Sequence, residues 1–363
     1  MTLIVKKKKQ HYIPRFYLKY FSNNEDKKTI GIYNIKKEIF ISIGSLKNQA
    51  YSSYFYGKDG NIEEGLSILE GHAADLISKM LKAKWVPEYG TLGHKILLTF
   101  IIFLSARTTY AADSMDEMLD KLIKKIFEED PRVKDYLDKI NIRYENPAAF
   151  SLAITSEVLL AGIISDLEFK LLVNNTETVF IPSDNPVVKY NQFLANKKTY
   201  GGITGFVIKG LQMMLPLNPR VYLIFYDKSV YKVGTRKHRV IEIKNNKDID
   251  ELNILQFVNA NNNFYFNHEI DERCITLIEI QGRKYRSEKK VNIKEYQEVT
   301  QSSERKKASL IQTYPKDVKT KLSLSFISIT KKAKKYKLGN KVVHIRSPKI
   351  IDKYEKLTSG SQF

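Results

Sequence analysis

Apolar side chains recur at helical spacing between residues 61 and 84, which predicts a long amphipathic helix. Asn61 is suited to cap this helix. The same period over residues 92–109, 115–128 and 147–167 predicts a mostly helical first half. Residues 96–106 are almost wholly apolar, but the run is bounded by charged residues and is too short to cross a bilayer, so we expect a buried core helix there.

Short β-rich runs replace the helical period after residue 168. The runs cover residues 169–173, 178–181, 206–209, 221–226 and 240–243, a helix is expected over 250–263, and residues 29–35 with 38–43 predict an early hairpin. We therefore predict an α+β fold, in which the helical N-terminal half packs on one side of a largely antiparallel sheet.

Charge divides the chain unevenly. Its 363 residues carry a formal net charge of +20, which favours a polyanionic partner, with nucleic acid ahead of anionic lipid. Residues 282–363 hold 22 of the 60 basic and 7 of the 40 acidic residues, which is +15 of that charge. We predict an α+β core over residues 1–281 and a basic C-terminal extension or small module over 282–363.

Two basic clusters in this extension are candidate phosphate contacts: Arg305, Lys306, Lys307, and Lys331, Lys332, Lys334, Lys335. The alternative is a solvated extension that only aids solubility.

Several classes of chemistry lack their signatures. The single Cys274 cannot form an internal disulfide, which favours a reducing cytoplasm, and the amino end does not have the pattern of a secretory signal. There is no phosphate-binding glycine loop and no serine-nucleophile elbow. Cofactors are unknown: ligand spacing does not support a divalent-metal site, and metal dependence is left open.

The opening segment, residues 10–21, places His11 and Arg15 among several aromatic residues. Arginine can hold a phosphate through two hydrogen bonds, and histidine can transfer a proton near neutral pH. Tyr12 and Tyr17 are candidate substrate contacts. The alternative is that His11 binds a buried carbonyl and that the aromatic residues belong to the core.

Two further groups of polar residues are candidates. Ser183, Asp184 and Asn185 lie between prolines, where they can form a tight turn, or aim Asp184 into a cleft to orient His11 or act as a general base. Glu63 and Glu70 are seven residues apart on one helix face, and Arg107 is a candidate partner; a structural ion pair is favoured over a metal site.

The opening segment with Phe21-Ser22 resembles the start of the DUF4238 family of prokaryotic and phage-associated proteins. Similar segments follow in the same order, at residues 62–70, 105–108, 181–186, 215–219 and 252–265. The family has no assigned function, so the resemblance implies no reaction. It implies instead that these separated segments meet in one pocket, which makes site candidates of His11, Arg15, Glu70, Arg107, Ser183, Asp184 and Asn185.

These observations favour a cytoplasmic nucleic-acid-directed enzyme: a ribonuclease, or another toxin or antiphage effector acting on a phosphodiester or nucleotide. RNA is the favoured substrate because its 2′-hydroxyl can serve as the nucleophile. A regulatory or antitoxin protein is a second expected partner, and no membrane partner is expected. The alternative is a non-catalytic sensor module that binds nucleic acid or protein and regulates a partner.

Overall fold

The computed structural model describes residues 8–23, 26–297 and 309–337, with positions 339, 342–346, 349 and 352. At its centre lies a five-stranded sheet, in the order β10 (Val240–Ile243), β5 (Glu168–Asn174), β8 (Val221–Tyr226), β7 (Gln212–Asn218) and β6 (Val188–Tyr190). Neighbouring strands are antiparallel except for the parallel pair β10 and β5. The predicted α+β class, with a largely antiparallel sheet, is confirmed.

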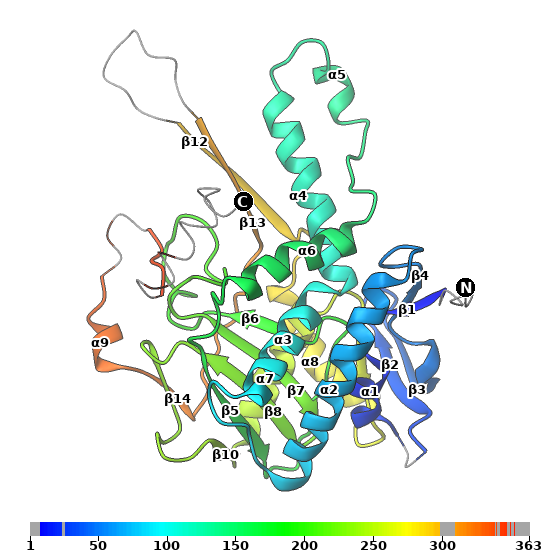
Figure 1. Ribbon diagram of the computed structural model, residues 1–363, viewed down its shortest axis with the longest axis vertical. Helices are drawn as coiled ribbons and strands as arrows, with labels where there is room; N and C mark the ends of the chain where they lie inside the picture. The colour runs from blue at the N-terminus through cyan, green and yellow to red at the C-terminus, as the bar shows by residue number, and fades with distance from the viewer. Residues whose placement is uncertain are drawn as a thin grey trace.

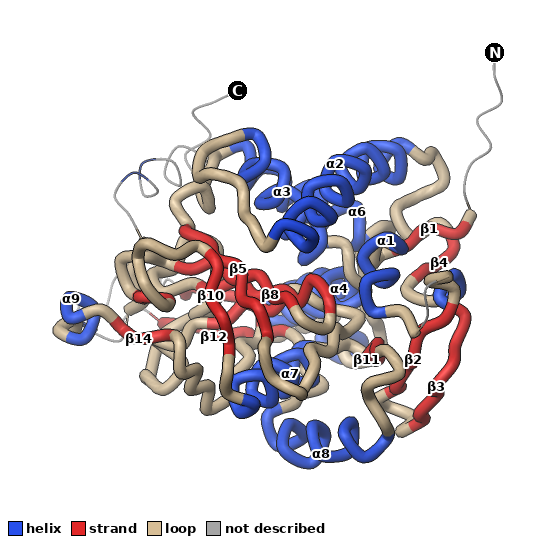
Figure 2. Tube along the Cα trace, turned by 90° about the horizontal axis from the view of Figure 1, so that it is seen from below, coloured by secondary structure: helices blue, strands red, loops and turns tan. Residues whose placement is uncertain are grey.

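Helices cover both faces of this sheet rather than one (Figures 1 and 2). Every residue of β8 is buried. Because side chains alternate across a strand, Leu223 and Phe225 pack into the same cluster as α2 (Asn61–Ala83) and α3 (Leu92–Ala106), whereas Tyr222 and Ile224 pack toward α7 (Asn246–Asn259). A strand that is apolar on both faces requires two covering layers, which corrects the expected one-sided packing.

A second sheet and a short ribbon begin the chain. The predicted hairpin is confirmed as β2 (Thr29–Asn34) and β3 (Ile39–Ser45), and β11 (Asn263–Phe266) pairs with β2. The strand β1 (Lys9–His11) pairs with β4 (Tyr51–Ser53). Short helical turns join these strands: α1 (Arg15–Leu18), η1 (Lys19–Phe21) and η2 (Leu46–Asn48).

Further helices are α4 (Thr109–Phe127), α5 (Lys134–Leu137), α6 (Pro147–Leu160) and α8 (Glu272–Gly282), with the turn η3 (Arg283–Tyr285). Asn61 is the first residue of α2 rather than its cap; the cap is Gly60, at a φ of 83°. The apolar run at residues 96–106 lies in α3 and is mostly buried. In the described part of the chain no single helix has the length and apolarity to cross a membrane, although α3 and α4, bent by 57°, meet both criteria as a pair.

Two predicted strands are wrong. Residues 206–209 form a turn, and the strand follows them as β7, which contains Pro216. Proline is tolerated there because the ladder with β8 shifts register between Pro216 and Asn218. Residues 178–181 belong to no strand; instead, the backbone of Val179 and Ile181 forms hydrogen bonds with the side chain of Asn253 on α7.

The C-terminal region is separate in charge but not in packing. The hairpin of β12 (Val291–Gln297) and β13 (Ser309–Pro315) contacts α4, and β14 (Ile327–Ile329) pairs with β9 (Tyr231–Val233). The short helix α9 (Lys331–Lys334) buries Ala333 in the cluster that contains Tyr222. The described residues after 281 therefore share a core with the rest of the chain.

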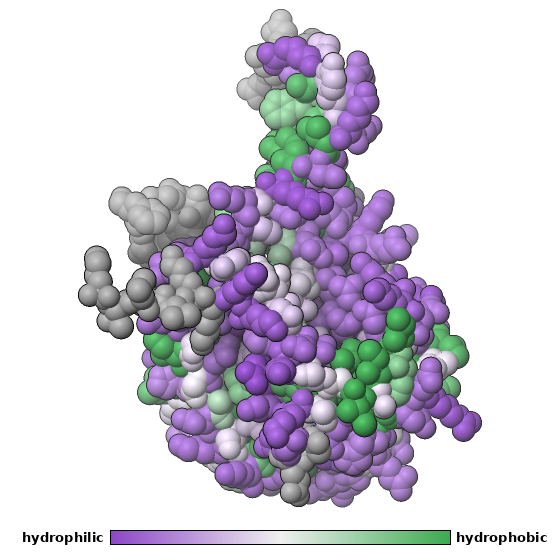
Figure 3. Space-filling model, turned by 90° about the vertical axis from the view of Figure 1, so that its right-hand side faces the viewer, coloured by the Kyte–Doolittle hydropathy of each residue, from purple (hydrophilic) through white to green (hydrophobic). Residues whose placement is uncertain are grey.

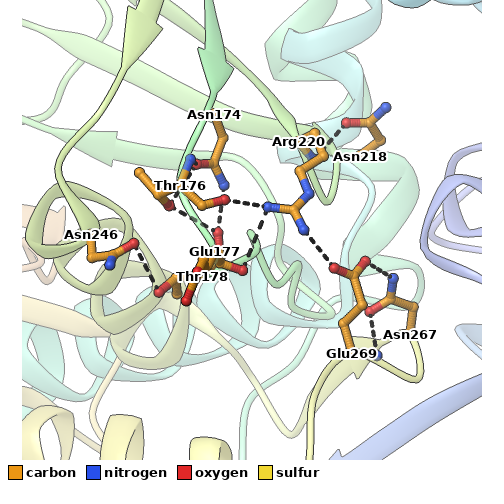
Figure 4. Close-up of polar contacts among 9 residues, drawn as sticks. All are labelled: Asn174, Thr176, Glu177, Thr178, Asn218, Arg220, Asn246, Asn267 and Glu269. Carbon is orange, nitrogen blue, oxygen red and sulfur yellow. Dashed lines mark hydrogen bonds and ion pairs between the residues drawn. The ribbon is translucent and has the colours of Figure 1, made fainter.

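One surface arginine joins three loops at the end of the sheet. Arg220 donates to the carbonyl oxygen of Thr176 at 2.5 Å and forms an ion pair with Glu269 at 2.6 Å (Figure 4). Asn267 holds the other oxygen of Glu269 at 2.7 Å. The Arg220 side chain remains 40% exposed, so solvent screens this pair.

Candidate functional site

The first α2 turns, β1, α1 and η2 surround a pocket of about 440 Å³. Its lining residues are Lys9, His11, Arg15, Lys47, Glu63, Ser67 and Glu70. The last three share a face of α2 because they are four and three residues apart. The side of the molecule that carries β1 and β4 is mostly hydrophilic (Figure 3). The pocket thus combines cations, carboxylates and an imidazole in a polar setting.

Arg107 fixes one wall of this pocket. It is 3% exposed, and it donates to Glu70 at 2.6 Å, to the backbone carbonyl of His11 at 2.6 Å and to the Tyr56 hydroxyl at 3.0 Å. The favoured ion pair between Glu70 and Arg107 is confirmed. Because all three contacts are made within the protein, Arg107 positions His11 and Glu70 rather than holding a substrate.

His11 presents a ring nitrogen without a protein partner. Its Nε2 is buried and has no hydrogen bond to any described residue. Desolvation lowers the pKa of His11 below the usual 6.5, and a backbone hydrogen bond at Lys47 opposes this shift; the charges of Arg15, Arg107 and Lys9 lower the pKa further. The imidazole is therefore neutral at pH 7 and can accept a proton.

Three cations surround the imidazole. Arg15 is the first residue of α1, which starts after Pro14, and its exposed guanidinium pairs with no described side chain. Lys47 is exposed on η2. Lys9 lies 4.5 Å from the ring centroid of Tyr51. Cations grouped in this way attract a phosphate or another anion.

Asp184 has a structural role, which corrects the expectation that it orients His11. It is fully buried, and its oxygens accept the backbone N–H groups of Asn261 at 2.7 Å, Asn262 at 2.7 Å and Asn263 at 3.0 Å. Burial raises the pKa of Asp184 to about 6, against the opposing effect of these hydrogen bonds. It is absent from the pocket lining, and its contacts anchor the start of β11 instead.

Side-chain amides of α7 hold the segment around Asp184. Asn253, Gln256 and Asn259 are spaced by three residues, so they lie along one side of the helix. The side-chain oxygen of Gln256 accepts from the Ser183 hydroxyl at 2.9 Å, and the backbone carbonyl of Asn259 accepts from the side-chain amide of Asn185 at 3.0 Å. Ser183 and Asn185 are therefore placed by structural contacts outside this pocket, not as its substrate contacts.

The candidate tyrosines belong to the core. Tyr17 is fully buried, and its hydroxyl donates to the carbonyl of Pro216 at 2.7 Å. Tyr12 is 8% exposed and packs against the ring of Phe55. Neither residue lines the pocket, so the alternative interpretation of these aromatic residues is the correct one.

The basic clusters of the C-terminal region lie apart from the pocket. Lys331, Lys332, Lys334 and Lys335 are exposed at α9, which Figures 1 and 2 place on the opposite side of the molecule from β1 and β4. Arg305, Lys306 and Lys307 lie outside the described residues. The described lysines could therefore meet the same ligand only if it were long enough to extend around the molecule.

Replacing Asp184 with asparagine is expected to destabilise the fold without changing the chemistry of the pocket. The amide NH₂ would face backbone N–H donors, so at least one buried donor would lose its acceptor, at a cost of about 1–3 kcal/mol. Urea unfolding at pH 7 measures this loss. Any activity that depends on the pocket should stay unchanged per folded molecule, and a selective loss of that activity would show that Asp184 has a catalytic role.

Sequence reasoning missed several residues of the pocket. Ser67 shares the helix face of Glu63 and Glu70, so the α2 period could have indicated it. Lys9 and Lys47 carried no such signal, because pairing of β1 with β4 and the turn η2 bring them together. Within the described ranges, no group of three or more His, Cys, Asp or Glu residues could hold a metal ion.

Comparison with known proteins identifies the family. A family described as "Protein of unknown function (DUF4238)" matches residues 9–269. No curated protein and no solved structure matches the chain. The matched range contains every residue that lines the pocket. Because the match covers more than half of the chain, this protein belongs to the DUF4238 family.

Proposed function

We propose that the protein is a cytoplasmic nucleic-acid-directed enzyme that cleaves RNA in the pocket around His11. The observation that carries the proposal is the buried, unpartnered Nε2 of His11 in a pocket also lined by Lys9, Arg15 and Lys47. These cations would hold the scissile phosphate, while the neutral imidazole would accept a proton.

The reaction uses the nucleophile that RNA itself supplies. His11 Nε2 takes the proton of the 2′-hydroxyl, the 2′-oxygen bonds to phosphorus, and the bond from phosphorus to the 5′-oxygen breaks. The leaving 5′-oxygen takes a proton from water, the hydroxide so formed accepts the proton held by His11, and a 2′,3′-cyclic phosphate remains. Arg15 and Lys47 neutralise the charge that grows on the phosphoryl oxygens.

The role of Arg15 is tested by Arg15→Ala, with Lys19→Ala as the control. Both cations are exposed and lie one helical turn apart, but only Arg15 lines the pocket. We expect Arg15→Ala to weaken both RNA affinity and turnover by at least roughly tenfold, because a phosphate contact acts in the ground state and in the transition state. Lys19→Ala should change neither beyond a small electrostatic effect.

The reaction distinguishes an enzyme from the alternative sensor module. Wild-type protein at a hundredth of the RNA concentration should cleave all of it, whereas a binding module would only shift RNA in proportion to the protein added. Expression of the wild-type protein should arrest growth if it acts as a toxin or effector, and His11→Ala should relieve the arrest. Binding without turnover under all conditions would overturn the proposal.

The pH profile gives an independent prediction. Only neutral His11 can accept the proton, so kcat/KM should be flat near pH 7 and should fall as acid protonates the imidazole. Because burial and the nearby cations lower the pKa of His11, the midpoint of this fall should lie below pH 6.5. Measurement of kcat/KM from pH 4.5 to 8 checks it; a midpoint above 6.5 would contradict the assignment.

A further inference from the structure

A second cavity, of about 390 Å³, lies between α4, α6, β6 and the region of β13. It shares no lining residue with the pocket around His11. Its walls include apolar side chains such as Met115, Ile154, Phe206 and Ile208. Ser105 and Ala106 also line this cavity, whereas the next residue, Arg107, binds the wall of the first pocket. The two cavities therefore meet the same segment of chain from different sides.

Lys189 brings a cation into this cavity from β6. Its Nζ lies 4.9 Å from the ring centroid of Phe206 and forms neither a hydrogen bond nor an ion pair with any other residue that the structure describes. The carboxylate of Asp317 acts on Lys189 from a distance, but its Oδ1 already accepts from Ile203 N and Thr204 Oγ1 at 3.0 and 2.9 Å. Burial lowers the pKa of Lys189, and the charge of Asp317 opposes this shift.

Two hydroxyl groups supply further donors. Ser151 and Thr155 are four residues apart on α6, so they lie on one face of the helix and both line the cavity. They are 5% and 6% exposed, and in the described structure neither side chain has a hydrogen-bond partner. By contrast, the nearby Ser114 hydroxyl donates to the carbonyl of Tyr110 at 2.7 Å. The free donors are thus confined to part of the cavity wall.

We propose that this cavity binds a small organic anion with an apolar body, and that Lys189 is the counter-charge of its carboxylate, sulfonate or phosphate group. A partly buried ammonium without a partner is costly, and an anion offsets that cost. Ser151 and Thr155 can donate to the anion, while Phe206, Ile208 and Met115 surround the rest of the ligand. A cavity of this volume suits a ligand of one or two rings.

Pyridoxal 5′-phosphate is a suitable probe, because it combines a ring, a phosphate and an aldehyde. The amine that pairs with the phosphate cannot at the same time attack the aldehyde, so trapping reports the probe molecules that present their aldehyde to Lys189. In these, the deprotonated amine adds to the aldehyde carbon and loses water to form an imine, which borohydride reduces to a stable secondary amine. After limited labelling of the full-length protein, peptide mass spectrometry should find Lys189 labelled roughly tenfold more than an average surface lysine. Labelling spread evenly over lysines, or concentrated on Lys9 and Lys47, would overturn the proposal.

Three variants separate charge from reactivity. Lys189→Met should weaken binding of pyridoxal 5′-phosphate roughly tenfold in equilibrium dialysis, as expected for the loss of one charge-assisted hydrogen bond. Lys189→Arg should keep the affinity within a few-fold but abolish trapping at position 189. The matched control is Lys197→Met: Lys197 is also half-buried and lies 3.9 Å from the ring centroid of Phe193, but it does not line the cavity.

These outcomes are independent of RNA cleavage. Wild-type affinity in Lys189→Met, with the variant folded by thermal melting, would refute the site even if the His11 pocket cleaves RNA. If Lys189→Met does not fold, equilibrium dialysis of Lys189→Arg decides instead: an affinity within a few-fold of the wild type supports the site, and a loss of tenfold or more contradicts it. Failure of the wild-type protein to bind the probe at millimolar concentration would also refute it.

Discussion

Replacing His11 with alanine is expected to lower RNA turnover per folded molecule by about 10²–10⁴-fold, the usual effect of removing a proton-transfer group. Affinity for RNA should change little, because Lys9, Arg15 and Lys47 are retained. The loss of stability should be modest: Arg107 and Tyr56 bind the backbone carbonyl of His11, which alanine keeps, whereas the hydrogen bond of the imidazole to the backbone of Lys47 is lost. Single-turnover cleavage, RNA binding and urea unfolding measure these three quantities.

His94 provides a matched control for this experiment. Like His11, it has a buried Nε2 without a hydrogen-bond partner in the described structure, and burial lowers its pKa. Its ring stacks on Phe169 with centroids 5.0 Å apart, in the core beneath α3. His94→Ala should therefore reduce stability but leave turnover per folded molecule unchanged. Equal turnover by folded His11→Ala and wild-type protein would refute the catalytic assignment.

Replacing Arg346 with alanine is expected to lower the free energy of unfolding by about 1–3 kcal/mol, because buried backbone acceptors would lose their donor, whereas the Asp166 carboxylate is 34% exposed and would be partly solvated. The Arg346 side chain is 1% exposed, and it binds both oxygens of Asp166 at 2.9 Å. It also donates to the carbonyls of Phe206 and Ile163, at 2.8 and 3.0 Å. The substitution would leave these acceptors without their donor and release the end of the described chain from the body.

Arg220→Ala is the matched control for Arg346→Ala. Arg220 also binds a carboxylate and a backbone carbonyl (Figure 4), but its side chain is 40% exposed. We expect a loss of about 0–1 kcal/mol, because solvent screens a surface pair. Urea unfolding of both variants gives the comparison, and equal losses would show that Arg346 does not anchor the C-terminal region.

Contacts between the C-terminal region and the sheet change the expectation that the basic extension is a separate module. A split at residue 281 leaves most of the net positive charge, +15 of +20, in the C-terminal part, which favours an independent arm. However, Leu324 and Ala333 are 3% exposed in a cluster shared with the sheet, and Ser325 binds Asp248 of α7. Deleting residues 282–363 would expose this cluster, so truncation is less suitable than point substitution for testing RNA binding by the lysines of α9.

The spacing of apolar residues along the sequence was sufficient to predict those helices and strands whose buried side chains recur at regular intervals. The sequence predicted the helices α2 and α3 and the hairpin of β2 and β3. Each of these elements buries apolar side chains, and the spacing of such side chains can be recognised over a few neighbouring residues. The strand β7 was missed because Pro216 normally disfavours a central strand. Its tolerance depends on a register shift against β8, which no local pattern contains.

The residues of the pocket could likewise be predicted from the sequence only in part. The residue types of the opening segment indicated His11 and Arg15, and the resemblance to the DUF4238 family added Glu70 and Arg107 as site candidates. Tertiary structure alone decided that Arg107 reaches back 96 residues to the carbonyl of His11, and that Asp184 binds the backbone of β11 instead of the imidazole. Hydrogen bonds between side chains and distant backbone depend on how strands and loops meet in space, so residue type shows the capacity to bond but not the partner.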